Sequence, residues 1–401
     1  MKAVLQVFVF DLVAKALLGG AAIVLIRYTP EQEYATYTFA LAISTLFSQT
    51  ITSTINRIYI IGYEEFKVRH ELSAFLWLQI WGIAALSLAL MPLASQLGAA
   101  YYFAAGLAAA SCLSEYCKTS LQQAQRFFGY SMAELGRAVV TAGGVLVLVF
   151  IYGHSVPAEG ILLAQAVTVG ALFLMLFHRT IDIAGAFRIR SATRLAATIA
   201  RGEYKWLLGY FLVLSLFGQV DVFMLKALAS SSELAGYGAA FRYYSLLSLA
   251  LAAVHVVLLP VIRQLNNIEE LRRVTAKHLM LTLAFIPLVL LLGWIAQWFL
   301  PWIDLGKYPQ SVDVFRVLCA SAVISFAFSP YVNIVMRYQK FRFLSGLIIF
   351  SLTVAVLLNL FLIPELGAIG AAMTTLTASA SFNVPIFFLS KRLLAEPQPA
   401  A

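Results

Sequence analysis

The stretch His278–Ile303 reads HLMLTLAFIPLVLLLGWIAQWFLPWI and contains no Asp, Glu, Lys or Arg. A helix that crosses the hydrocarbon core of a bilayer needs about 20 consecutive, mostly apolar residues. Five further runs also lack charged residues: Ser73–Ser114, Ala138–Ala158, Tyr243–Ile262, Phe343–Pro364 and Leu366–Ser390. These runs predict an integral membrane protein built entirely from α-helices.

The composition supports the same prediction. The chain has 401 residues, of which 61% are hydrophobic and only 12% are charged, about half the charged fraction of an ordinary soluble protein. The formal net charge of +9 suits contact with anionic inner-leaflet lipid, so we do not expect a nucleic-acid partner. The three cysteines, Cys112, Cys117 and Cys319, lack the spacing of a metal site. We expect neither a bound metal nor a cofactor.

We predict twelve membrane spans. They cover residues 3–26, 34–58, 73–95, 98–118, 129–152, 156–178, 206–228, 234–262, 278–300, 312–336, 342–363 and 366–390. The predicted organisation is an N-terminal six-helix bundle (1–183), a cytoplasmic basic linker (184–205) and a C-terminal six-helix bundle (206–401).

The positions of the basic residues test this topology. With the N-terminus inside, most of the 28 Lys and Arg residues fall in the cytoplasmic segments, and the outer loops keep only Arg27, Lys226 and Lys307. This is the asymmetry of the positive-inside rule. It predicts a multi-pass membrane protein with both termini in the cytoplasm.

The central linker reads FRIRSATRLAATIARGEYKW over residues 187–206. Apolar Ile189, Leu195 and Ile199 alternate with basic Arg194 and Arg201, a pattern typical of a basic amphipathic helix on a membrane surface. A solvated linker is the alternative. Anionic membrane lipids are the partners that this charge predicts.

The two predicted bundles echo each other at equivalent points. Residues at the start of the second span recur with the same spacing at the start of the eighth: Glu33, Ala35, Tyr37, Ala40, Leu46 and Ser48 match Glu233, Ala235, Tyr237, Ala240, Leu246 and Ser248. Six spans in each half give both halves the same orientation. The pattern therefore predicts two bundles related by a pseudo-two-fold axis along the membrane normal, which is typical of transporters.

Four stretches resemble those of a known protein family: IRYTPEQEYATY (26–37), LQQAQRFFGY (121–130), QVDVFML (219–225) followed by ELAGY (233–237), and NLFLIPELGAIGAA (359–372). In order and spacing, the chain resembles the bacterial polysaccharide and O-antigen flippases of the multidrug/oligosaccharidyl-lipid/polysaccharide exporter (MOP) superfamily. The resemblance implies two six-helix bundles and transfer of a polyprenyl-pyrophosphate-linked oligosaccharide from the inner to the outer leaflet. It also implies polysaccharide polymerase machinery as a partner and a location in the bacterial inner membrane.

Charged side chains within the predicted spans are the candidate functional residues, because a charge at bilayer depth is costly and usually faces a partner or a water-filled cavity. They are Asp11, Lys15, Glu115, Glu134, Arg137, Asp221, Arg242 and Arg316. An arginine suits a pyrophosphate because its planar guanidinium binds phosphate through two hydrogen bonds. We predict a substrate cavity lined by Asp11, Lys15, Arg137, Asp221, Arg242, Arg316, Tyr210, Tyr243 and Tyr244.

Asp221 and Arg242 lie at similar depth on either side of an outer turn, about 13 Å in from it, so we expect them to meet. The pair is either a buried salt bridge or a gate that faces the cavity. Asp11 and Lys15 share one helix face. They form either an internally neutralised pair or a cavity cation beside a carboxylate that could carry a coupling proton. Glu115 is expected at the interface, and Glu134, Arg137 and Arg316 are near enough to an interface to be explained without function. Coupling to a proton or sodium gradient would use Asp11, Glu134 or Asp221.

Two other functions remain open. A drug or organic-cation exporter of the same superfamily would have an acidic cavity, whereas basic and acidic residues in these spans are balanced. A membrane enzyme is the second alternative. A polysaccharide polymerase would carry a large outer loop, which the predicted topology lacks, and an acyltransferase would need a reactive histidine beside an acid. We therefore predict a transporter and not an enzyme.

Overall fold

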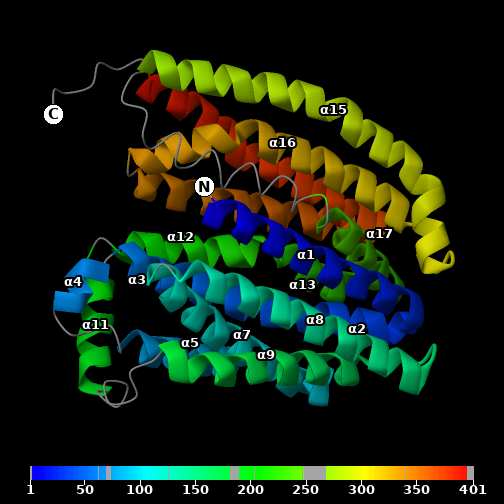
Figure 1. Cartoon of the computed structure of the whole chain (residues 1–401). Coiled ribbons are helices and arrows are strands. Elements are labelled where there is room, and N and C mark those ends of the chain that lie inside the picture. The colour runs from blue at the N-terminus through cyan, green and yellow to red at the C-terminus, as the bar shows by residue number, and fades with distance from the viewer. Residues whose placement is uncertain are drawn as a thin grey trace. The chain divides into compact units, whose positions relative to one another are not determined.

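A computed structural model describes residues 2–61, 63–68, 74–124, 126–180, 189–202, 204–245, 247, 268–338 and 340–394. Every regular element within these ranges is a helix (Figure 1). The chain divides into two compact units, residues 1–219 and 220–401. Each unit is described below by itself.

The first unit contains long helices joined by short turns. They are α1 (Lys2–Tyr28), α2 (Glu31–Ile51), α3 (Arg57–Ile61), α4 (Tyr63–Val68), α5 (Ala74–Ala89), α6 (Ala94–Leu97), α7 (Ala99–Gln123), α8 (Phe127–Tyr152), α9 (Ala158–Thr180), α11 (Ile189–Arg201) and α12 (Tyr204–Phe217). Helix α7 packs on α9 and on α2, and α1 packs on α8. These helices correspond to the first six predicted spans, the linker and the start of the seventh span.

Glycines make the sharp corners of this unit. Gly98, between α6 and α7, has φ +55° and ψ −131°, and Gly153, after α8, has φ +59° and ψ −123°. Residues with a Cβ atom rarely adopt a positive φ. These two positions therefore allow successive helices to turn back within very few residues.

The second span is not a regular α-helix throughout. Residues Thr52–Asn56 form a π-helical turn, η1, between α2 and α3. The hydroxyls of Thr52 and Thr54 donate to the carbonyls of Ser48 at 2.5 Å and Thr50 at 2.6 Å. Such π-helical turns are rare and are frequent at functional sites. Nearby, the Gln79 amide of α5 donates to Asn56 Oδ1 at 2.5 Å in a buried contact, which joins the turn to the third span.

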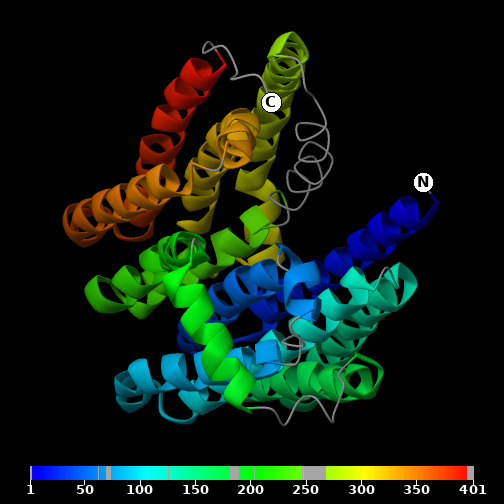
Figure 2. The same ribbon diagram turned by 90° about the vertical axis from the view of Figure 1, so that its left-hand side faces the viewer.

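The predicted amphipathic linker helix is present as α11, and it packs against α5 and α12 (Figures 1 and 2). Ala192, Leu195 and Ile199 are buried on one side, while Arg194 and Arg201 are exposed. The apolar side is thus covered by protein. A helix bound to lipid through its apolar face would leave that face open.

The second unit contains α13 (Val220–Leu228), a helix over residues 231–245, α15 (Ile268–Asp304), α16 (Ser311–Arg337) and α17 (Phe341–Leu393). Helix α16 packs between α15 and α17, and α13 packs on α17. Helix α17 contains both of the last two predicted spans. Gly367 (φ +56°, ψ −131°) breaks its helical geometry between them. The residues beyond 245 in the eighth predicted span, except 247, lie outside the described residues.

The described helices account for all twelve predicted spans, the eighth only over residues 231–245. Within the described residues, five helices are long and apolar enough to cross a membrane, judged by length and composition alone, or up to seven if each of two bent helix pairs is one span. This number is below twelve partly because α17, which contains two predicted spans, counts as one helix. The chain is an all-α, multi-pass membrane protein.

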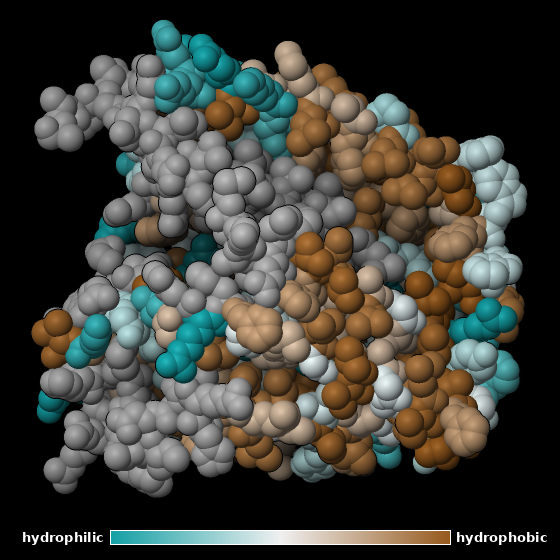
Figure 3. Space-filling view, in the orientation of Figure 1, coloured by the Kyte–Doolittle hydropathy of each residue, from teal (hydrophilic) through white to brown (hydrophobic). Residues whose placement is uncertain are grey.

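Large apolar side chains cover the outside of these helices. Phe150 is 91% exposed, Met175 is 74% exposed and Trp302 is 68% exposed. Figure 3 shows broad apolar areas on the face in view. In water such patches would promote association, whereas in a bilayer they contact lipid tails.

The boundary between the two compact units falls after Gln219 in the chain. Helix α12 belongs to the first unit, where it packs against α2 and η1. The predicted seventh span therefore consists of α12 and α13, separated at Gly218 and Gln219. The predicted bundle boundaries at 183 and 205 stay a prediction.

Candidate functional site

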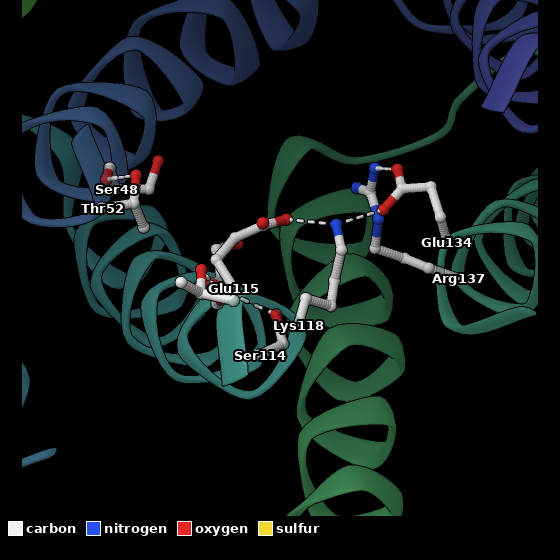
Figure 4. A network of polar contacts seen from close by, with 9 residues as sticks. Ser48, Thr52, Ser114, Glu115, Lys118, Glu134 and Arg137 are labelled. Carbon is white, nitrogen blue, oxygen red and sulfur yellow. Dashed lines mark hydrogen bonds and ion pairs between the residues drawn. The ribbon is translucent and has the colours of Figure 1, made fainter. Parts of the chain in front are cut away.

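Four charged side chains from α7 and α8 form a continuous network in the first unit (Figure 4). Lys118 Nζ lies 2.7 Å from Glu115 Oε1 and 2.5 Å from Glu134 Oε2. The other oxygen of Glu134, Oε1, pairs with Nη2 of Arg137. The charges alternate along the chain Glu115–Lys118–Glu134–Arg137, which we call the α7–α8 network.

The centre of this network is buried and its ends are not. The side chains of Lys118 and Glu134 are 4% and 9% exposed, whereas those of Glu115 and Arg137 are 40% and 28% exposed. A buried ion without a partner is costly, and a paired one is tolerated when its hydrogen bonds are satisfied. Lys118 has two carboxylates and also lies 5.1 Å from the centre of the Tyr130 ring, a favourable cation–π contact.

Lys118 is the last residue of the predicted span 98–118 and belongs to the predicted cytoplasmic set of basic residues. Its side chain is buried within the first unit, and its side of the membrane stays a prediction. Because each helix presents a Glu and a basic residue three positions apart, the charged faces of α7 and α8 can interlock. The recurrence of this spacing, in Glu115–Lys118 and Glu134–Arg137, is the sequence signal that could have predicted the network.

A second polar centre surrounds Asp221 of α13 in the second unit. Asn359 Nδ2 donates to Asp221 Oδ1 at 2.8 Å, and the Tyr237 hydroxyl donates to Oδ2 at 3.0 Å. The Thr375 hydroxyl also donates to Oδ2. Asp221 is buried, and these three neutral donors come from the 231–245 helix and from both halves of α17.

The predicted pair between Asp221 and Arg242 is wrong. Among the described residues, the hydrogen-bond partners of the Asp221 side chain are Tyr237, Asn359 and Thr375, and Arg242 is half-buried elsewhere on its helix. Arg242 stands five positions after Tyr237, which is about 7.5 Å along a helix. Tyr237 is therefore the residue that reaches Asp221, and sequence reasoning missed it.

The same interhelical contact occurs in both units. Glu33 Oε2 accepts a hydrogen bond from the backbone N–H of Ala158 at 2.8 Å, at the start of α9. Glu233 Oε2 accepts one from Ala368 at 2.6 Å, at the start of the second half of α17. A carboxylate suits the unsatisfied N–H groups and the positive end of a helix. This recurrence gives the internal repeat seen in the sequence a structural basis.

The repeat also reveals where the units differ. In the first unit, Gln165 Nε2 donates to the Tyr37 hydroxyl at 3.0 Å. In the second unit, Tyr237 stands four residues after Glu233, as Tyr37 does after Glu33. Thr375 stands seven residues after Ala368, as Gln165 does after Ala158. Tyr237 and Thr375 meet on a carboxylate. The acidic centre thus belongs to the second unit.

Arg316 lies between two helices of the second unit. Its Nε donates to the Gly293 carbonyl of α15 at 2.9 Å, and Nη1 pairs with Asp313 at 3.0 Å. Nη2 lies 3.5 Å from Gln297 Oε1. These contacts join α15 to α16. The predicted role of Arg316 in the cavity stays a prediction.

The remaining predicted site residues are dispersed. Lys15 is half-buried on α1, and the side chain of Asp11 lies outside the described residues, so their pairing stays a prediction. Tyr210 is buried in the first unit, beside Phe211. In the second unit Tyr243 is buried, and Tyr244 packs against Phe241. Their predicted contact with substrate also stays a prediction.

The architecture defines the class of protein as a multi-pass helical membrane protein with repeated halves. No family model matches the sequence, and no curated protein sequence matches it. Solved structures do match. The lipid II flippase MurJ, in an inward closed conformation, has a TM-score of 0.75 and 14% identity over 96% of this chain and 87% of that chain.

Two further solved structures agree. A multidrug resistance MATE family transporter of the MOP superfamily, inward-facing, has a TM-score of 0.68 and 13% identity over 96% of this chain and 94% of its own. A MOP superfamily transporter from Pyrococcus furiosus has a TM-score of 0.64 and 13% identity over 98% of this chain and 96% of that chain. The chain therefore shares its fold with these solved structures, and this is the fold that the sequence resemblance implied.

Proposed function

We propose that this protein is a flippase that moves a polyprenyl-pyrophosphate-linked oligosaccharide from the inner to the outer leaflet by alternating access, for surface polysaccharide synthesis. The observation that carries the proposal is the pair of cations Lys118 and Arg137 around Glu134, with Arg137 28% exposed on α8, a helix that is long and apolar enough to cross a membrane. A carrier of an anionic lipid needs cations inside the low-dielectric region. The similarity of the fold to a lipid II flippase supports a lipid-linked substrate.

The direct test measures which leaflet holds the substrate. Vesicles containing the purified protein and a labelled lipid-linked oligosaccharide are treated with a membrane-impermeant enzyme that cleaves the sugar. With an active flippase, the cleaved fraction rises beyond the half that starts outside. A cleaved fraction equal to that of protein-free vesicles, in a preparation that binds the substrate, would contradict the proposal.

We propose that Asp221 binds the coupling cation, a proton or a sodium ion. Its carboxylate contacts only neutral donors among the described side chains. Asn359, which donates to Asp221 through Nδ2, also has a buried acceptor, Oδ1, that has no hydrogen-bond partner in the described part of the chain. Buried acceptors of this kind are costly unless something satisfies them, and a bound cation would do so.

Coupling is tested by imposing either gradient on the same vesicles. A sodium gradient that accelerates flipping in the native protein, and not in Asp221→Asn, identifies sodium, and the matching result with a pH gradient identifies the proton. Flipping that is equally fast with and without both gradients would contradict coupling through Asp221 and leave the flippase proposal intact.

A drug or organic-cation exporter is the second candidate. The solved structures with this fold include multidrug MATE transporters, and Asp221 is a buried carboxylate that could pair with an organic cation. Export of a fluorescent cation that is lost in Asp221→Asn, without any flipping of lipid-linked sugar, would favour this candidate. A membrane-embedded polymerase or acyltransferase is less well supported, because the fold is one of transporters.

We further propose that the protein lies in the bacterial inner membrane with both termini in the cytoplasm. The exposed Arg194 and Arg201 of α11 support contact with anionic lipids of the inner leaflet, and polysaccharide polymerase machinery is the proposed protein partner. Labelling of single cysteines at positions 2 and 201 by an impermeant reagent, only after cells are opened, is the expected result. Labelling in intact cells would reverse the topology.

A further inference from the structure

The α7–α8 network has a geometry that a purely structural salt bridge does not require. Glu115 lies about 12 Å from the end of α7, and Arg137 lies about 15 Å from the start of α8, at 1.5 Å per residue. Both side chains are partly exposed, at 40% and 28%. A charged side chain in a predicted span usually faces water or a partner. An anion in water could therefore reach the network at either of its partly exposed ends.

The charges of the network match those of one particular group. Lys118 and Arg137 carry two positive charges, and Glu115 and Glu134 carry two negative ones. A diphosphate that links a lipid to a sugar also carries about two negative charges. Each of its phosphates has one acidic oxygen left after esterification, and that oxygen is ionised at neutral pH. Exchange of the two carboxylates for one diphosphate would leave the total charge of the two cations and their partners unchanged.

We propose that the α7–α8 network binds the diphosphate of the substrate, which displaces Glu115 and Glu134 from Lys118 and Arg137. This inference rests on the proposed flippase function and identifies the site where the anionic group binds. The Arg137 guanidinium offers a planar pair of donors that fits two phosphate oxygens, while Lys118 contributes a compact charge. No covalent bond is made or broken.

The two glutamates take the place of the substrate when the site is empty. Without them, two cations would remain near one another with Lys118 buried, and an uncompensated buried charge is strongly destabilising. Because the glutamates are covalently held beside the cations, they can rebind as soon as the diphosphate leaves. They thereby limit affinity and favour release on the far side of the membrane.

The two-charge match distinguishes sources of phosphate. A diphosphate replaces both glutamates, whereas an ordinary phospholipid headgroup with a single phosphodiester charge replaces only one. We therefore expect inorganic pyrophosphate to bind more tightly than dimethyl phosphate, a phosphodiester with a single charge, and more tightly than inorganic sulfate, whose two charges lie on one centre. Equal binding of all three would indicate a general anion surface and would overturn the diphosphate assignment.

The experiment measures pyrophosphate binding to the purified full-length protein in nanodiscs of neutral lipid, by isothermal titration at low, fixed ionic strength. Arg137→Gln should weaken binding by about tenfold or more, as expected from the loss of hydrogen bonds to a charged group. Arg137→Lys keeps the charge without the planar fork and should weaken binding less. Arg194→Gln, which removes an exposed cation on α11 in the same unit, is the matched control and should leave the affinity unchanged.

Glu115→Gln is the deciding variant, because the proposal predicts a gain. Removal of a partly exposed competitor for Lys118 should tighten pyrophosphate binding by about twofold to fivefold, the usual worth of such an ion pair. Glu159→Gln, which removes an exposed acid at the first turn of α9, is the control for net charge. A structural role for Glu115 would instead leave the affinity unchanged or weaken it.

The outcomes separate this inference from the flippase proposal. Absent pyrophosphate binding in the native protein, or unchanged affinity in both Arg137→Gln and Glu115→Gln, overturns the diphosphate site even if vesicles show flipping. If Arg137→Gln does not fold, Glu115→Gln and Arg137→Lys still decide. Binding that changes as predicted, in a protein that flips no lipid-linked sugar, would retain the site and overturn the flippase.

Discussion

Glu33 accepts a hydrogen bond from the backbone N–H of Ala158 at 2.8 Å, and this contact joins the start of α2 to the start of α9. The equivalent contact, Glu233 with Ala368 at 2.6 Å, joins the corresponding helices of the second unit. Each unit is thus held together at the same point by a carboxylate on a helix N-terminus. An internal repeat that was visible as scattered identities in the sequence is therefore also a repeat of one specific interaction.

Glu33→Ala should lower the free energy of unfolding by about 1–2 kcal/mol, because it leaves the N–H groups at the start of α9 without their acceptor. Glu33→Gln keeps an oxygen acceptor and should recover much of this loss. Thermal unfolding in detergent measures both. Glu365→Ala, at an exposed position, is the control, and equal stabilities of Glu33→Ala and the native protein would refute the contact.

Gly367→Ala should be more destabilising than Gly98→Ala, although the two glycines have nearly the same backbone angles. The unfavourable positive φ costs about 1–3 kcal/mol at either position. A Cβ at Gly98 would meet open space, whereas at Gly367 it would collide with the Glu233 side chain and displace it from Ala368. The difference should disappear when both variants are made in a Glu233→Ala background. A difference that persists there would assign it to another cause.

The contrast between predicted and observed features has a physical explanation. The spans could be predicted because a helix in lipid needs a long apolar run, which depends only on local sequence. The last two spans were predicted as 342–363 and 366–390, and the structure breaks the helical geometry of α17 close to that boundary, at Gly367. The chain also shows the fold that the resemblance implied.

The candidate sites were harder to predict, because side-chain partners depend on helix rotation and register as well as depth. Asp221 was identified correctly as a buried in-span charge, but its partners Asn359 and Thr375 lie more than a hundred residues away in sequence. Depth alone could not distinguish Tyr237 from Arg242 on the same helix. Similarly, Lys118 lies near the end of α7, where a residue could equally snorkel to water or turn inward.

A double-mutant cycle should detect strong coupling between Asp221 and Tyr237 and none between Asp221 and Arg242. For Asp221→Asn combined with Tyr237→Phe, we expect an interaction energy of about 0.5–3 kcal/mol, as is usual for residues in one hydrogen-bond network. Asp221→Asn combined with Arg242→Gln should be additive within about 0.5 kcal/mol. Denaturant unfolding of the single and double variants provides the values. Coupling of Asp221 to Arg242 as large as that to Tyr237 would restore the ion pair.

Glu134→Gln should destabilise the protein by about 3–5 kcal/mol, because it removes the carboxylate that pairs with both Lys118 and Arg137. Glu115→Gln should cost far less, about 0–1 kcal/mol, since Glu115 is 40% exposed. Both variants remove one negative charge from the same network. Their unfolding midpoints should therefore differ because of burial, and equal midpoints would show that the centre of the network is hydrated.

Leu195→Ala should loosen α11, whereas Arg194→Ala on the adjacent, exposed position should not. Leu195 is completely buried against the rest of the first unit, where α11 packs on α5 and α12, and truncation of a buried leucine costs about 2–5 kcal/mol. Amide hydrogen exchange over residues 189–201 should accelerate in Leu195→Ala alone. If the apolar side of α11 were instead bound to lipid, exchange in detergent-solubilised native protein would already be fast and would slow on reconstitution into anionic bilayers. Slow exchange in both environments is the result that packing on α5 requires.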